Sequence, residues 1–109
     1  MKYNVLSIPP FDRQLKRLAK KFPSLKAEYA VLIEELEDNP EKGTPLGHNC
    51  FKIRLRIASK GRGKSGGARV ITHIYIENQT VFLLAIYDKG EQTDISDREL
   101  KELLSEIEK

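Results

Sequence analysis

Residues 51–57 read Phe-Lys-Ile-Arg-Leu-Arg-Ile, so apolar and cationic residues alternate at every position. Successive side chains of a β-strand point to opposite faces, and the alternation therefore predicts a half-buried strand with one apolar and one cationic face. The cations are Lys52, Arg54 and Arg56, spaced roughly 7 Å apart along the strand. Phosphates along a nucleic-acid strand have a similar spacing, so this row predicts a surface that follows an RNA or DNA backbone.

The charge distribution around this strand supports the same interpretation. Residues 44–76 carry seven Lys/Arg and no Asp or Glu, whereas residues 77–109 carry four Lys/Arg and nine Asp/Glu. The net charge of +3 therefore conceals a concentrated basic region, which favours a polyanionic ligand. A solvated basic surface without any ligand is the alternative.

The sequence before the alternating strand predicts a strand and two helices. Residues 3–8 are short and apolar enough for a first strand, and Pro9-Pro10 ends it. Apolar residues then recur at helical spacing over residues 11–22 and 25–36. Ser24 lies where it can cap the second helix. The break between the helices is short, which favours an antiparallel hairpin.

The sequence after the alternating strand predicts a loop, two strands and a helix. Glycines and cations fill residues 58–67, and strands are expected over residues 69–76 and 80–87. The last strand is apolar on both faces, so it should lie inside the sheet and be covered on both sides. Ser96 and Glu99 have the spacing of a capping box for a C-terminal helix.

These elements predict an α+β fold in the order β-α-α-β-β-β-α, with an antiparallel sheet packed on the helical hairpin. We expect a single domain over residues 1–109.

Composition excludes several classes of site. His48, His73 and Cys50 share no ligand spacing, so we expect neither a metal nor a cofactor. The lone cysteine favours a reducing cytoplasm, and no apolar run predicts a membrane span or signal peptide. Gly61-Arg62-Gly63-Lys64-Ser65 is no P-loop, because Ala58 stands where that motif needs glycine.

Further residues are candidates for the same cationic site. If residues 58–67 join a hairpin, Arg69 should lie near Arg56 and His73 near Lys52, although His73 is better explained as a filler of the strand face than as a catalytic base. The end of the last strand adds Tyr87 and Lys89. We expect the loop cations Lys60, Arg62 and Lys64 to bind RNA phosphates together with Arg56 and His73.

Three segments together resemble the RelE/ParE toxin superfamily, and most closely its HigB branch. They are Cys-Phe-Lys-Ile-Arg-Leu-Arg at 50–56, Ser-Gly-Gly-Ala-Arg-Val-Ile at 65–71 and Tyr-Asp-Lys-Gly-Glu at 87–91. The resemblance implies the toxin of a type II toxin–antitoxin system, a ribosome-dependent endoribonuclease that cleaves mRNA. It also implies a partner antitoxin, which we expect to carry a helix-turn-helix domain.

The resemblance assigns the cutting to basic side chains where this chain has Lys52, Arg54 and Arg69. A lysine crowded by arginines can act as a base, and the cations stabilise the transition-state charge. RelE-like toxins add an Arg and a Tyr after the last strand, positions that look like Gly90 and Ile95 or Ser96 here. Lys89 or Tyr87 is therefore the candidate for the missing acid.

Two alternatives to the ribonuclease remain. A ParE-like toxin has this fold but inhibits DNA gyrase without catalysis, and it lacks the catalytic cations. A basic RNA-binding module without turnover is the other. The presence of Lys52, Arg54 and Arg69 favours the ribonuclease.

Overall fold

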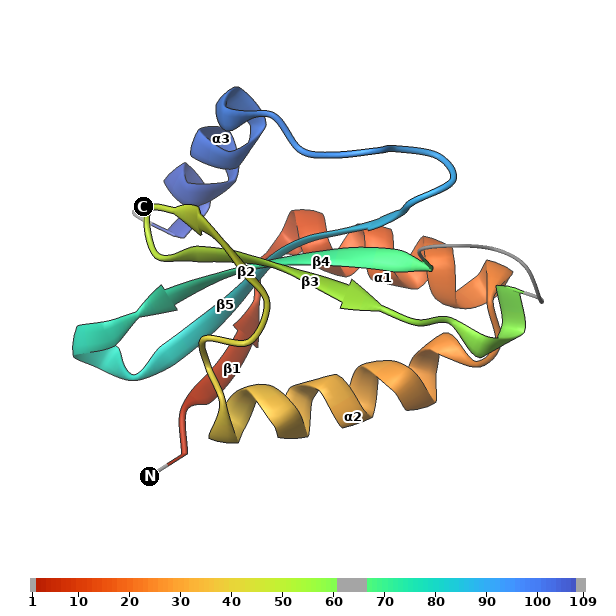
Figure 1. Ribbon diagram of the computed structural model, residues 1–109, viewed down its shortest axis with the longest axis horizontal. Coiled ribbons are helices and arrows are strands. Elements are labelled where there is room, and N and C mark those ends of the chain that lie inside the picture. Colours follow the sequence, from red (N-terminus) through yellow and green to blue (C-terminus); the bar gives the residue numbers. More distant parts are fainter. Residues whose placement is uncertain (1, 61–66, 108–109) are drawn as a thin grey trace.

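The structure is a computed structural model that describes residues 2–60 and 67–107. Its helices and strands are β1 (Asn4–Ser7), α1 (Pro9–Lys21), α2 (Leu25–Asp38), β2 (Thr44–Gly47), β3 (Cys50–Leu55), β4 (Ala68–Tyr75), β5 (Thr80–Asp88) and α3 (Asp97–Ile107). Two short 3-10 turns, η1 (Ala58–Lys60) and η2 (Ile76–Asn78), flank β4. The strands form one sheet in the order β1-β5-β4-β3-β2, and Figure 1 shows α2 and α3 on opposite sides of it.

The predicted α+β fold is confirmed, and the structure adds two features to it. Residues 44–47, for which the sequence predicts neither helix nor strand, form the edge strand β2 beside β3. Pro45 is tolerated there because an edge strand has one side without hydrogen-bonding partners. The first strand β1 pairs with β5 in parallel, so the sheet is antiparallel only from β5 to β2.

The last strand, β5, lies inside the sheet between β1 and β4, as its apolar sequence predicts. Both α1 and α3 contact it. Because β1 pairs only with Thr80–Leu83, no strand of the described residues lies beside that edge of β5, opposite β4, from Leu84 onward. Among the described helices, none has the length and apolarity needed to cross a bilayer.

The two helix starts that we predicted differ in their chemistry. Ser96 and Glu99 form the expected capping box, with the Glu99 N–H donating to Ser96 Oγ at 3.1 Å. Ser24 stands at the start of α2, but its hydroxyl makes no capping hydrogen bond to the helix. It bonds instead to Ser59 Oγ at 2.8 Å and so ties α2 to η1.

The alternation along β3 divides its side chains as predicted. Ile53 and Leu55 are buried in the core formed with the inner sides of α1 and α2, whereas Arg54 is exposed. Burial of a large aliphatic side chain contributes roughly 1.5–3 kcal/mol, so this face stabilises the fold. The opposite face of β3 carries its cations.

Candidate functional site

Three of the predicted site residues lie side by side across the sheet. Arg54 of β3 is opposite Arg69 of β4, and Arg69 is opposite Tyr87 of β5. Directly paired residues of neighbouring strands point to the same face, so these side chains form a lateral row. Lys52 precedes Arg54 by two residues and shares that face. The structure therefore brings Lys52, Arg54, Arg69 and Tyr87 together.

The expected register between β3 and β4 was wrong by two residues. Arg69 lies opposite Arg54 rather than Arg56, and Lys52 lies opposite Ile71 rather than His73. The expected register assumed that residues 58–67 simply connect the two strands of a hairpin. In the structure, residues 58–60 form η1. A shift by two residues preserves the face of every side chain, and the cations therefore still share a face.

Gly67 fixes where β4 begins to pair with β3. Its φ of +46° lies in the left-handed region, and a Cβ there would stand 2.4 Å from the Leu55 carbonyl oxygen. Only glycine allows so close an approach of two backbones. The pairing then starts at Leu55 and Ala68 and continues to Arg54 and Arg69.

His73 lies at the other end of this face, opposite Cys50. Its Nδ1 is 3.5 Å from Cys50 Sγ, and a small pocket joins it to Leu104 and Ile107 of α3. Lys52 does not lie opposite His73 as we expected. The role of His73 in RNA binding stays a prediction. Within residues 2–60 and 67–107, no three His, Cys, Asp or Glu side chains are grouped as metal ligands.

The cations on and beside this row differ in their exposure to solvent. Arg54 and Arg56 are exposed, whereas Arg69 retains only 7% exposure and its Nη1 donates to the Ala68 carbonyl at 3.2 Å. Burial of a guanidinium is costly unless its donors are satisfied. Arg69 is thus held in place and largely desolvated, whereas Arg54 is open to solvent.

Tyr87 is the row's non-cationic member. It is 6% exposed, and its hydroxyl is buried without a hydrogen-bond partner among the described residues. Burial raises the pKa of the phenol, the charges of Asp94 and Glu99 raise it further, and Arg69 opposes them. Tyr87 therefore stays protonated at neutral pH, and its hydroxyl proton has no acceptor within residues 2–60 and 67–107.

The segment between β5 and α3 adds an acidic residue, Asp94, to which the sequence assigns no role. Asp94 Oδ1 lies 3.4 Å from Lys52 Nζ. The backbone N–H of Ile95 lowers the pKa of Asp94 most, and Lys52 and Lys89 lower it further. Lys52 therefore shares a face with Arg54, as predicted, but its ammonium contacts a carboxylate. No local sequence pattern predicts this contact, because the two residues lie far apart in the sequence.

Lys89, the second candidate from the end of β5, lies in the same segment. Its ammonium donates to the Thr93 carbonyl at 2.8 Å, and its charge acts on Asp94. Lys89 thus helps to hold the segment and is near the site, but it belongs to the loop rather than to the sheet row.

Ion pairs anchor the start of this segment to α1. Arg17 Nη2 lies 2.8 Å from Glu91 Oε1, and Lys21 Nζ lies 3.5 Å from Glu91 and 3.9 Å from the buried Asp88. Asp88 also accepts a hydrogen bond from the Gly90 N–H. Arg17 and Lys21 of α1 are therefore paired with acidic residues at the start of this segment.

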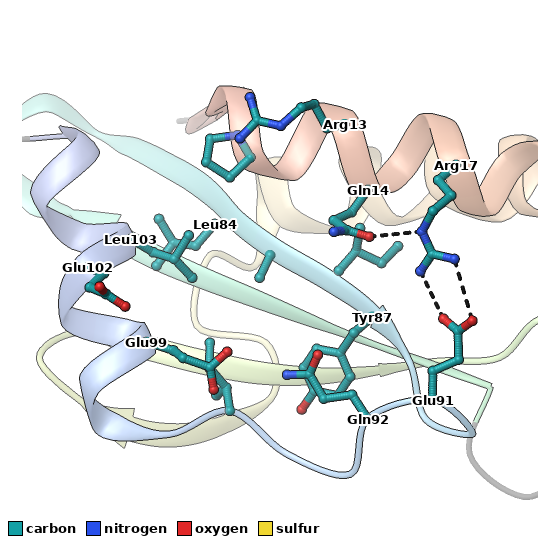
Figure 2. A pocket seen from close by; sticks show the side chains of 14 residues that line it. Arg13, Gln14, Arg17, Leu84, Tyr87, Glu91, Gln92, Glu99, Glu102 and Leu103 are labelled. Atoms are coloured by element: carbon teal, nitrogen blue, oxygen red, sulfur yellow. Dashed lines mark hydrogen bonds and ion pairs between the residues drawn. The ribbon is translucent and has the colours of Figure 1, made fainter.

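A cleft of about 460 Å³ lies beside the open edge of β5, between α1 and α3. Figure 2 shows Arg13 and Arg17 on its α1 side and Glu99 and Glu102 on its α3 side, and Tyr87 and Gln92 also line it. Tyr87 is thus shared between this cleft and the cation row.

The loop cations cannot be placed in the site. Arg62 and Lys64 lie outside the described residues, and only the backbone of Lys60, the last residue of η1, is described. Their role in RNA binding stays a prediction from sequence.

Comparisons with known proteins agree with this fold. The free E. coli toxin RelE, solved as a double arginine-to-alanine mutant, is similar with a TM-score of 0.63 and 20% identity, over 98% of this chain and 99% of that one. The Mycobacterium tuberculosis RelBE2 toxin–antitoxin complex gives 0.60 and 22%, over 81% and 99%. The intact E. coli RelBE toxin–antitoxin complex gives 0.60 and 19%, over 79% and 95%. At these identities the likeness shows a shared fold.

The family itself is shown by sequence. A model of the RelE family, described as the RelE toxin of the RelE/RelB toxin–antitoxin system, matches residues 11–108. The closer assignment to the HigB branch stays a prediction. Because the match covers nearly the whole sequence, the chain belongs to the RelE toxin family.

Proposed function

We propose that this RelE-family chain is a ribosome-dependent endoribonuclease that cleaves mRNA and so blocks translation. The observation that carries the proposal is the row of Arg54, Arg69 and Tyr87 across three strands, with Lys52 on the same face. Two arginines directly opposite each other repel, and that repulsion is relieved when an anion binds between them. A gyrase inhibitor without catalysis has no need of such a row.

The row suits cleavage by the ribose 2′-hydroxyl. The 2′-oxygen attacks the neighbouring phosphorus, the bond from phosphorus to the 5′-oxygen breaks, and the products are a 2′,3′-cyclic phosphate and a 5′-hydroxyl. Arg54, Arg69 and the Lys52 ammonium neutralise the charge that develops on the phosphate oxygens, and the attacking 2′-hydroxyl gives its proton to solvent. Tyr87, a buried protonated phenol, supplies the proton for the 5′-oxygen, and Lys89 is the second candidate.

The proposal includes the partners of the toxin. Two of the similar solved structures are toxin–antitoxin complexes, which supports a cognate antitoxin for this chain, and we expect that protein to carry a helix-turn-helix domain. We place the protein in the cytoplasm, where mRNA and ribosomes are its targets. Arg56 and the loop cations Lys60, Arg62 and Lys64 bind RNA phosphates in this proposal.

Purified protein on programmed ribosomes tests the proposal. We expect rapid cleavage of mRNA on the ribosome and slow cleavage of naked RNA, because the ribosome must orient the 2′-hydroxyl for attack. The new ends should be a cyclic phosphate and a 5′-hydroxyl. Equal rates with and without ribosomes would contradict ribosome dependence. Inhibited gyrase supercoiling with intact mRNA would favour the ParE-like alternative.

A further inference from the structure

We propose that Asp94 is a positioning residue of this site, whose carboxylate holds the Lys52 ammonium in place beside the row of Arg54, Arg69 and Tyr87. The inference rests on the proposed ribonuclease activity, which it deepens by adding a residue from outside the sheet. Neither the basic composition of the strands nor the resemblance to the toxin superfamily assigns any role to this carboxylate.

The side chains of Lys52 and Asp94 differ in their conformational freedom. Lys52 carries its charge on a flexible four-carbon chain, so its ammonium has more positions available than a carboxylate on a short side chain. Asp94 has a short side chain, and its Oδ1 accepts the Ile95 N–H at 2.9 Å while lying 3.4 Å from Lys52 Nζ. The carboxylate is thus the fixed member of the pair.

Hydrogen bonds and ion pairs hold the segment around Asp94 in place. The Gln92 side chain donates to the Asp94 carbonyl at 2.9 Å, and the Lys89 ammonium donates to the Thr93 carbonyl at 2.8 Å. Further back, Glu91 is paired with Arg17 and Lys21 of α1. Side chains from α1 and from the segment itself therefore place this carboxylate next to Lys52.

The electrostatic effect of Asp94 extends beyond Lys52. Asp94 acts on Tyr87 as well as on Lys52, so its charge lies within the group that faces the phosphate. A carboxylate at such a place weakens the binding of a phosphate by repulsion. If Asp94 positions Lys52, its loss should slow the chemical step. If its carboxylate only fills the place where the phosphate binds, its loss should tighten RNA binding and leave the chemical step unchanged.

Steady-state cleavage on programmed ribosomes separates these two effects. For Asp94→Ala we expect kcat to fall about fivefold, the upper range for an exposed ion pair, while KM stays unchanged or falls. Asp94→Asn keeps an oxygen within reach of Lys52 Nζ, so its kcat should lie between those of Asp94→Ala and the wild type. Asp97→Asn is the matched control, because it removes the same charge three residues away without contacting Lys52 in the described structure.

Each outcome decides the inference. An unchanged kcat in Asp94→Ala, with or without a lower KM, overturns it, as does an equal fall of kcat in Asp97→Asn. Thermal unfolding of the variants shows whether a lost activity is a lost fold, since Asp94 is largely exposed and its loss should leave the Tm unchanged. If the wild-type protein does not cleave mRNA, the proposed function fails instead.

Discussion

One face of the sheet has two ends with opposite surroundings. At one end, Lys52, Arg54, Arg69 and Tyr87 lie beside the polar segment that carries Asp94. At the other end, on the same two strands, His73 lines a pocket with the apolar residues Leu104 and Ile107 of α3, and Cys50 lies opposite His73. A helix with an apolar side covers one end, and a segment held by ion pairs borders the other.

The difference shows how one strand serves two purposes along its length. Cys50 and Arg54 point to the same face of β3, yet Cys50 is 1% exposed and Arg54 is exposed. The apolar cover of α3 stabilises its end through burial. At the cationic end Arg54 is exposed and Lys52 partly exposed, so substitutions of these two residues should change activity and leave stability nearly unaltered.

The largest effect should come from Tyr87→Phe. If the phenol donates the proton to the leaving oxygen, its loss slows cleavage about 100- to 10,000-fold. The hydroxyl is buried without a partner among the described residues, so its removal should leave the free energy of unfolding unchanged or slightly higher. Single-turnover cleavage and denaturant unfolding measure the two quantities.

Tyr29→Phe is the control for this variant. Tyr29 packs on Phe11 at a ring separation of 5.9 Å, within the helical hairpin. Its loss of a hydroxyl should not slow cleavage. Full activity of Tyr87→Phe would remove Tyr87 from the mechanism and leave Lys89 as the candidate acid.

The next effect concerns the cations of the row. Lys52→Ala and Arg54→Ala should each slow single-turnover cleavage on saturated ribosomes about 100- to 1000-fold, as expected for one lost transition-state contact. Both side chains are partly or fully exposed, and both variants should therefore retain the wild-type Tm. For the buried Arg69, Arg69→Lys is the better variant, because it keeps the charge and loses only the planar donor geometry. Wild-type rates in all three would place the chemistry elsewhere.

The loop cations give a smaller effect of another kind. A variant with Ala at Lys60, Arg62 and Lys64 should bind programmed ribosomes more weakly, with the log–log salt dependence reduced by about one unit for each lost phosphate contact. Its single-turnover rate at saturation should match the wild type. A loss of the chemical step in this variant, with normal chemistry in the strand variants, would invert the assignment.

The elements that were predictable from sequence are those with a strong local period. The alternation over residues 51–57 predicted β3 and the separation of its two faces, and helical spacing predicted the hairpin of α1 and α2. Even the error of two residues in the register left the cations on one face, because side chains repeat every second residue. The candidate row was therefore largely predictable, apart from the exact pairing of its members.

Other features depend on contacts that a local pattern does not contain. Thr44-Pro45-Leu46-Gly47 has the composition of a loop and becomes the edge strand β2 only because β3 lies beside it. The parallel pairing of β1 with β5 depends on the path of the whole chain. Asp94 belongs to the site through one contact with Lys52, 42 residues away, and acidic residues are frequent in that part of the sequence.

The smallest effect tests the covered end of the face through pH. Burial raises the pKa of the Cys50 thiol to about 11, against about 8.5 for a free cysteine. Above pH 8.5 the unfolded chain loses this proton while the folded protein keeps it, so the folded state binds more protons and its stability falls as the pH rises toward 11. The slope from one group is at most about 1.4 kcal/mol per pH unit.

Cys50→Ser should remove this part of the pH dependence, because serine has a similar volume and does not titrate in this range. Denaturant unfolding of both proteins between pH 8 and about 10 gives the comparison, in which the titration of lysine and tyrosine is common to both. Parallel curves would mean that α3 does not keep the thiol from water. Because Cys50 lies beyond the row, opposite His73, cleavage by Cys50→Ser should remain at the wild-type rate at neutral pH. A loss of activity there would mean that the two ends of the face act as one site, contrary to the separation that their surroundings indicate.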